Sequence, residues 1–411
     1  MQNEERKRAW ELLTAARVPE VSSGFDRPLS TADFLPYTAA CEGHLERVIE
    51  ALEERATRDA TEAEKSKLIA EAVLLAGEHS AKSLWTTDNS LALGSKLLGL
   101  LLSKENHPSL SLLLTCNNQK IFKTALDALR PTLLQKTWKK FPAAILCFSW
   151  ILKHVKSPHL GDHLNKVLPT ALIITDDFES QNRILGLDCI HHIIDNVTKS
   201  ELTMYNFHDV IIEALRPVLY HNEPHVISPM IKTYVGLMNK LHPQHPVTNL
   251  ARNCFDDIFE IILKNMYLEQ NINVRTMYIE CLPLLIKAKG LTTLRHGNLI
   301  YKILEEYILD TTSRHLALEV LIEVLKVSWP RKKWVFDSTM RILLKLIYNY
   351  TKNRSELSPD MIDKLKIILA TLTHLSPDDA KSLINDMKKY DTIDGFHSVL
   401  ISFFPHELSA E

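Results

Sequence analysis

Glycine is scarce in this sequence, and the short motifs of nucleotide-binding and catalytic sites are missing from it. Only 11 of the 411 residues are glycine, whereas average usage near 7% would give about 29. Strand-rich domains and phosphate-binding loops need glycine in their turns, so this composition favours helices with short polar connections. No Walker A phosphate loop, GxGxxG, HExxH, GxSxG or kinase HRD motif occurs. We therefore expect neither an enzyme nor a bound cofactor.

A dominant charge and long apolar runs are missing too. Lysine and arginine number 48 against 50 aspartate and glutamate, a net charge of −2. No general attraction to nucleic acid or to an anionic membrane is therefore expected. The longest apolar run, around Ala143–Leu152, falls well short of the ~20 residues of a membrane-spanning helix. The amino-terminal residues lack an apolar segment and do not resemble a secretory signal.

The six cysteines form no CxxC pair, and most of them lie within apolar runs. We expect buried, reduced thiols, which suit a reducing compartment. Together with the missing secretory signal, this predicts a protein of the cytoplasm and the nucleus.

Amphipathic helical runs fill most of the sequence, and no period-two strand pattern occurs. A first helix is expected at 4–17, followed by a loop with proline and glycine near 18–36. The run 45–76 is also helical in pattern, with a highly charged middle that we interpret as a solvated face or connector. Further helical runs are expected at 91–102, 109–115, 121–134 and 143–155.

One motif recurs: an arginine, then aliphatic residues, then an acidic residue five positions after the arginine. Three copies begin at Arg183, Arg275 and Arg314, and a weaker one begins at His225. The spacing is near the ~40–47-residue period of two-helix HEAT repeats. We interpret the arginine and acidic positions as exposed or inter-repeat contacts rather than as chemistry. The upstream helix of each pair is expected at 166–174, 210–219, 255–265 and 298–309.

Stacking follows from these repeats, because one helical hairpin cannot bury its apolar face alone. The sequence therefore predicts an all-α fold, an α-solenoid of HEAT- or armadillo-like helical hairpin repeats at 91–411. Residues 1–90 are expected to form an N-terminal helical segment. Such a solenoid presents a ridge of helix ends and a concave face rather than a deep polar pocket.

Histidines and acidic residues crowd the stretch Phe148–Ile193. A zinc site would need three or four ligands at fixed offsets, and the adjacent His191 and His192 point to different helix faces. Helix-end hydrogen bonds and core packing are therefore favoured over a metal site. They are also favoured over a hydrolytic pair made of Asp162 and His163.

Two charged segments remain as candidate docking sites. Asp176 and Asp177 precede a helix expected from about Gln181, where they can favour the helix dipole or meet a basic partner. Three basic residues lie between Trp329 and Trp334. They can form a solvated loop before a proline-initiated helix, or attract an acidic partner or a phosphate.

A known family shares many of the rarer residues of the central block. The matching residues are Trp138-Lys139, Phe148-Ser149-Trp150, His154, Lys156, Leu160-Gly161-Asp162-His163-Leu164, Val167-Leu168-Pro169, Asp176-Asp177, Asn182, Ile184-Leu185-Gly186, Cys189 and His191-His192-Ile193. On these residues the sequence resembles the Tel-two-interacting protein two family, over about 105–345. The resemblance implies an α-solenoid scaffold or adaptor without catalytic activity. It further implies a subunit of the Triple T (TTT) complex, formed with the Tti-one and Tel-two proteins.

The same resemblance implies a co-chaperone task for that complex. With the Hsp-ninety chaperone system it would support the folding, assembly and stability of the phosphatidylinositol-3-kinase-related kinases, such as mTOR, ATM and ATR. The DNA damage response and TOR signalling would depend on it for that reason. Nucleic acid and membranes are not expected partners.

Seven residues are predicted to contact partners through the exposed ridge of helices, most of all Tti-one. They are Lys156, Asp162, His163, Asp176, Asp177, Asn182 and Arg331. A second hypothesis is a HEAT-repeat cargo carrier of the nuclear transport type. Such a carrier would need acidic residues repeated along its concave face, and the balanced charge argues against it.

Overall fold

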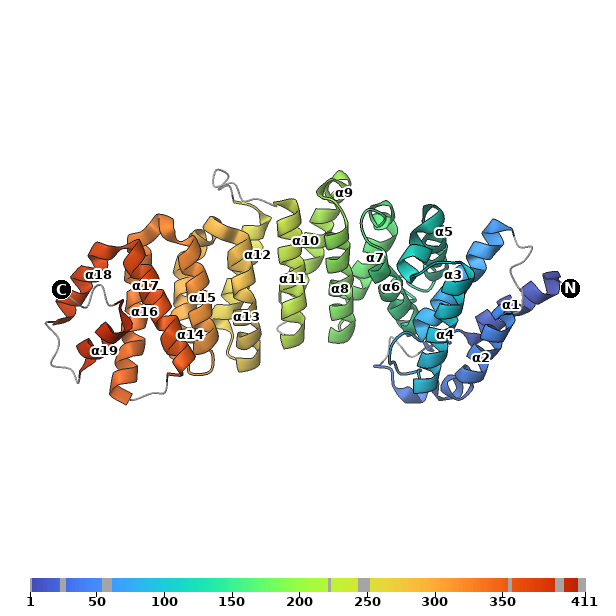
Figure 1. Ribbon diagram of the computed structural model, residues 1–411, viewed down its shortest axis with the longest axis horizontal. Coiled ribbons are helices and arrows are strands. Elements are labelled where there is room, and N and C mark those ends of the chain that lie inside the picture. Colours follow the sequence, from blue (N-terminus) through green and yellow to red (C-terminus); the bar gives the residue numbers. More distant parts are fainter. Residues whose placement is uncertain are drawn as a thin grey trace. The chain divides into compact units, whose positions relative to one another are not determined.

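Helices make up all the regular structure in the part of the chain that the computed structural model describes (Figure 1). The described residues are 2–22, 27–53, 61–220, 223–242, 252–353, 357–388 and 395–405. The chain divides into two compact units, Met1–Ile211 and Ile212–Glu411. None of the helices in the described ranges is long and apolar enough to cross a membrane. The predicted all-α solenoid is confirmed, and each unit is a stack of packed helices.

The second unit shows the repeat most clearly. Figure 1 shows α12 beside α13 and α14 beside α15, as antiparallel hairpins. Helix α11 packs on α13, α13 on α15 and α15 on α17, while α12 packs on α14 and α14 on α16. Two layers of helices therefore enclose a continuous apolar core. The helices are α10 (Phe207–Val218, which spans the unit boundary), α11 (Pro224–Leu241), α12 (Cys254–Leu268), α13 (Ile272–Lys289), α14 (Gly297–Leu309), α15 (Arg314–Val327), α16 (Lys332–Asn353), α17 (Pro359–Leu375), α18 (Pro377–Met387) and α19 (Phe396–Phe403).

The first unit begins with less regular packing and has a tight hairpin, α7–α8, near its end. Helix α3 contacts α4, α5 and α6, and α7 packs along α8. The α-helices are α1 (Gln2–Ala16), α2 (Leu35–Glu53), α3 (Glu62–Glu78), α4 (Asp88–Lys104), α5 (Leu110–Leu129), α6 (Pro142–His154), α7 (Leu164–Thr175), α8 (Ser180–Asn196) and α9 (Lys199–Met204). Short 3-10 turns, η2 (Thr31–Phe34), η3 (Trp138–Lys140) and η4 (Gly161–His163), precede α2, α6 and α7.

The predicted repeats correspond to the helix pairs α7 and α8, α10 and α11, α12 and α13, and α14 and α15. Their arginines are less exposed than we predicted. The guanidinium groups of Arg183 and Arg314 are buried, and each donates to a carbonyl six residues earlier, at Asp177 and Ile308. Carbonyls in the last turn of a helix, such as that of Ile308, and in the connection after it, such as that of Asp177, have no partner within the helix, so an arginine at the start of the next helix can satisfy them. Arg275 does make the predicted inter-repeat contact, with Glu306 at 3.0 Å.

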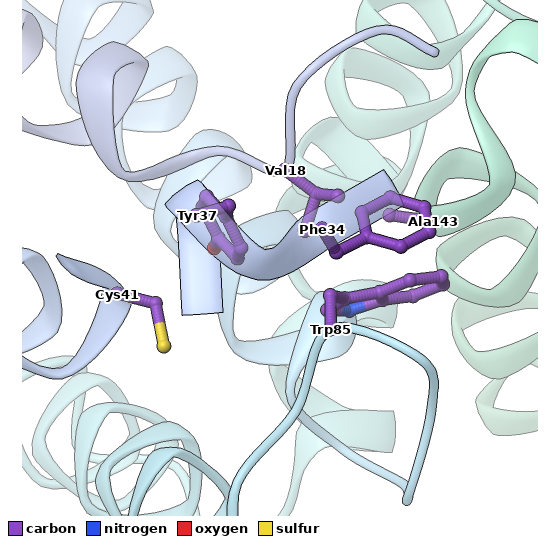
Figure 2. Packing of buried hydrophobic residues seen from close by; sticks show 6 residues of the cluster. All are labelled: Val18, Phe34, Tyr37, Cys41, Trp85 and Ala143. Carbon is purple, nitrogen blue, oxygen red and sulfur yellow. The ribbon is translucent and has the colours of Figure 1, made fainter. Parts of the chain in front are cut away.

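Two residues of the predicted loop 18–36, Val18 and Phe34, belong to the core of the first unit. Val18, Phe34 and Trp85 gather with Ala143 of α6 in one apolar cluster (Figure 2). The rings of Phe34 and Trp85 lie 5.4 Å apart, and Ser30 caps η2. Residues 23–26 of this predicted loop lie outside the described residues. The predicted boundary near residue 90 stays a prediction.

The helical run predicted at 45–76 consists of two helices in the described residues, α2 and α3. Residues 54–60, in its charged middle, lie outside the described residues. Thr61 caps α3, and its backbone N–H donates to the carboxylate of Glu64, which completes a capping box. The cap gives α3 a start of its own.

Helix α5 is interrupted at Cys116–Gln119, as the separate runs predicted at 109–115 and 121–134 indicated. Asn117, Asn118 and Gln119 all have left-handed backbone angles, with φ of 46°, 55° and 58°. Left-handed residues normally occur singly, because the conformation costs roughly 1–2 kcal/mol for a residue with a Cβ atom. The turn places the buried amide of Gln119 against His163.

Asn118 is exposed, so its replacement tests this backbone turn without removing a buried contact. We expect Asn118→Val to lower the free energy of unfolding by about 1–2 kcal/mol, because β-branched residues avoid positive φ. Asn118→Gly should leave stability unchanged or slightly raised. Urea denaturation of both variants measures the difference. Equal stability of the two variants would contradict the left-handed turn.

Candidate interaction surface

Asp177 lies buried beneath the connection between α7 and α8, although we predicted it to be an exposed docking residue. Only 4% of it is exposed. One carboxylate oxygen lies 2.5 Å from the ammonium of Lys139 in η3, and the other accepts from the Asn182 amide at 2.7 Å. Lys139 is itself buried and requires a counter-ion. The expectation of exposure is therefore wrong for Asp177, because its carboxylate neutralises a buried lysine.

Phe178 covers this ion pair from the solvent side. Its ring lies 3.7 Å from the Lys139 ammonium, which is within cation–π distance. The ring is 63% exposed, an unusual position for a phenylalanine. Asp176, the neighbour of Asp177, remains exposed. The sequence did not indicate that Lys139 and Phe178 lie against Asp177. This grouping could not be predicted because η3 and the α7–α8 connection are far apart in the sequence.

Asp177 and Asp176 form a matched pair for mutagenesis. We expect Asp177→Asn to lower the free energy of unfolding by about 2 kcal/mol, because Lys139 keeps its contact with Phe178 but loses its counter-ion. Asp176→Asn should change stability by less than about 0.5 kcal/mol. Chemical denaturation of both variants measures this. An equal effect of the two substitutions would show that the buried pair contributes nothing.

His163 is also buried, and its ring has a structural partner. Its Nε2 atom hydrogen-bonds the side-chain oxygen of Gln119, while Phe122 meets the ring edge-on at 5.0 Å. Burial lowers the pKa of His163, and nearby Lys123 adds to this effect. Asp162 is exposed. His163 thus supports the core from η4, and its ring is not displayed to a partner.

No group of three or more His, Cys, Asp or Glu side chains within the described ranges lies close enough to hold a metal ion. The side chains of His191 and His192, the two histidines considered as metal ligands, lie on different faces of α8, as expected for adjacent residues of a helix. His192 donates from Nε2 to the backbone carbonyl of Val155 at 2.9 Å, whereas His191 lies 3.5 Å from Asp195 on its own helix. Both rings have local structural contacts.

The remaining predicted residues belong to both units. Lys156 is exposed in the turn before η4, and Asn182 is half-buried against Asp177. Arg331 is exposed in the second unit. It lies in a 3-10 turn, Trp329–Arg331, directly before α16, in agreement with the proposed solvated loop and proline-initiated helix. Trp329 is 57% exposed there.

A pocket of about 300 Å³ opens between α5 and α7. Phe148 of α6 and three buried leucines line it, and Leu134 stands at its rim with 52% of its surface exposed. Most of the residues that line this pocket are apolar. Sequence reasoning missed it because α5 and α7 are separated by about forty residues and their apolar positions resemble ordinary core positions.

Comparison with known proteins supplies the family context. A profile described as the Tti2 family matches residues 127–312. Proteins named TELO2-interacting protein 2 are similar to this chain, at 30% identity in Mus musculus, 31% in Rattus norvegicus and 30% in Homo sapiens. The alignments cover 74%, 67% and 71% of this chain, and 63%, 56% and 60% of the relatives. The chain thus spans somewhat more than half the length of these relatives.

Solved structures add information on the fold alone. The chain resembles Kap95 in a Kap95:Nup1 complex, with a TM-score of 0.52 at 14% identity, over 90% of this chain and 44% of that one. A Kap95p structure with RanGDP gives the same TM-score and identity, over 93% of this chain and 49% of that one. These nuclear transport proteins share the all-helical repeat architecture.

Proposed function

The chain belongs to the Tti2 family, and from this membership we propose that it is a non-catalytic scaffold subunit of a multiprotein complex. The name of the relatives describes them as interacting with TELO2. We extend this interaction to the present chain and place it in the TTT complex, with the Tel-two and Tti-one proteins. Family membership is the observation that carries the proposal.

The exposed side chains support a role in binding proteins. Large apolar residues are exposed at helix ends: Phe178 between α7 and α8, Leu268 at the end of α12, and Trp329 before α16. Exposed aromatic residues often become binding hot spots, because they exclude water from a large area at low entropic cost. A rigid stack of helices can hold such residues in place for a larger partner.

We further propose the task of the complex. Together with the Hsp-ninety chaperone system it would assist folding and assembly of the phosphatidylinositol-3-kinase-related kinases, in the cytoplasm and the nucleus. The chain would contribute surface and rigidity, and the catalysis of ATP turnover would belong to the chaperone. The alternative function, a carrier of the nuclear transport type, is supported only by the shared helical-repeat fold. At 14% identity, the similarity to Kap95 is evidence for the fold alone.

Affinity purification of the tagged chain, with bound proteins identified by mass spectrometry, tests this proposal. We expect stoichiometric recovery of Tti-one and Tel-two, and smaller amounts of the large kinases. A tagged helical-repeat protein of another family serves as the control. Recovery of importin-cycle proteins with a broad set of cargoes would instead favour the carrier, and a chain without partners would overturn the adaptor.

A further inference from the structure

The pocket between α5 and α7 has a shape and lining that suit the binding of apolar side chains. Its floor is Phe148, which is 1% exposed, and one wall is formed by Leu129 and Leu133. Pro169 and Ile173 of α7 form the facing wall. At about 300 Å³ the pocket is at the small end of the range for ligand sites. It suits a few projecting side chains better than a whole small molecule.

The charges around this pocket have one dominant sign. The two charged residues that line it, Arg130 and Lys166, are both basic, and one acidic residue, Asp127, lies beside them. The acidic residue, Asp127, is paired with Lys166 at 2.6 Å. Arg130 lines the pocket and is exposed. In the described part of the chain, no carboxylate lies within ion-pairing distance of Arg130.

Two further lysines extend this basic rim. Lys123 lies one turn before the pocket-lining Leu126 of α5. Lys136 is exposed in the connection that follows the rim residue Leu134. An approaching acidic segment would therefore meet positive charge at Arg130, directly after α5, and at Lys136, beside Leu134.

We propose that this pocket binds an acidic amphipathic helix of a partner protein. Apolar side chains of the helix would fill the space above Phe148, and its acidic side chains would face Arg130 and Lys136. Leu134 would change from half exposed to buried in the complex. This inference rests on the proposed function, because the partner is taken to be the Tti-one–Tel-two subcomplex. It adds the position of the binding site on this chain and the chemistry of the contact.

Affinity measurements with the purified Tti-one–Tel-two subcomplex test the pocket. We expect Leu134→Glu and Arg130→Glu each to weaken binding at least tenfold, since one blocks the apolar entrance and the other reverses the rim charge. Leu112→Glu, on the first part of α5, and Lys96→Glu, on α4, are matched controls because both residues are exposed outside the pocket. Circular dichroism melts confirm that all four variants fold.

Photo-cross-linking identifies the occupant. A benzophenone amino acid is placed at position 134 of the full chain, and the segment cross-linked in the subcomplex is sequenced. An acidic amphipathic helix of Tti-one or Tel-two is the expected product. A basic segment, a second copy of this chain, or affinities equal to those of the controls would overturn the pocket while the wild-type complex still forms. Failure of the wild-type chain to bind would overturn the proposed function itself.

Discussion

Replacement of Asp256 by alanine is expected to lower the free energy of unfolding by about 3–5 kcal/mol, because it leaves a buried lysine without its counter-ion. Asp256 lies at the start of α12 and is 1% exposed. One of its carboxylate oxygens lies 2.5 Å from the ammonium of Lys289, which is 2% exposed, and the other lies 2.9 Å from Arg295. The same carboxylate accepts from the backbone N–H of Asn253 in the capping box of α12.

Asp257 is a matched control for this substitution. It is adjacent in the sequence, but it is exposed and pairs with Arg252 on the surface, at 2.7 Å. Exposed ion pairs contribute about 0–1 kcal/mol, so Asp257→Ala should change stability by less than about 1 kcal/mol. Urea denaturation of both variants at neutral pH measures the contrast. If Asp256→Ala lowers the free energy of unfolding no more than Asp257→Ala does, the buried network has no stabilising role.

The buried network around Asp256 also predicts that the stability of the fold depends on pH. Burial alone would raise the pKa of Asp256, but the hydrogen bonds from Lys289 and the Asn253 backbone, with the charges of Lys289 and Arg295, together lower this pKa below the ordinary value. A carboxylate with a lowered folded-state pKa contributes stability above its unfolded pKa of about 3.9 and loses it as the pH falls through the folded value. We therefore expect the stability difference between wild type and Asp256→Asn to shrink below about pH 4.

Replacement of Gly186 by alanine is expected to have the second-largest effect, a loss of about 3 kcal/mol. Helices α7 and α8 approach so closely at Gly186 that an added Cβ atom would lie 2.5 Å from the backbone nitrogen of Thr175 and 2.8 Å from its Cα atom. Backbone atoms of a packed helix cannot rotate away as a side chain can. The two helices must therefore separate, which disturbs the core between them.

Gly99 provides the opposite case on α4. An added Cβ atom there meets nothing within 4 Å, and alanine is a better helix former than glycine by about 1 kcal/mol. Gly99→Ala should therefore raise the melting temperature while Gly186→Ala lowers it. Differential scanning calorimetry of the two variants measures both signs. A rise in melting temperature for Gly186→Ala would show that α7 and α8 are not in close contact.

The repeat architecture was predictable from the sequence because it depends on periodicity along the chain. The motif beginning at Arg183, Arg275 and Arg314 correctly placed the second helices α8, α13 and α15. The upstream runs correctly placed α7, α12 and α14. Each helix of such a pair needs one apolar face to pack on its neighbour, and this need leaves a regular trace in the sequence.

The surface was less predictable because it depends on which distant residues meet. Of the two adjacent aspartates, Asp176 is exposed and Asp177 is buried, because Asp177 pairs with Lys139. The sequence does not show which of the two meets this lysine. The pocket above Phe148 likewise depends on the distance between α5 and α7, which no local pattern records. The left-handed turn at Asn118 leaves only a polar break in the sequence. Partner-binding roles for exposed residues such as Lys156 stay predictions.

The central claim is that this chain is a structural subunit of a complex with Tti-one and Tel-two. Light scattering coupled to size-exclusion chromatography, on the three purified proteins mixed in equal amounts, tests it most directly. The proposal predicts a single species with the summed mass of the three chains, which persists on dilution to nanomolar concentration. Elution of this chain as a separate species of 47.0 kDa, with Tti-one and Tel-two still bound to each other, would contradict it.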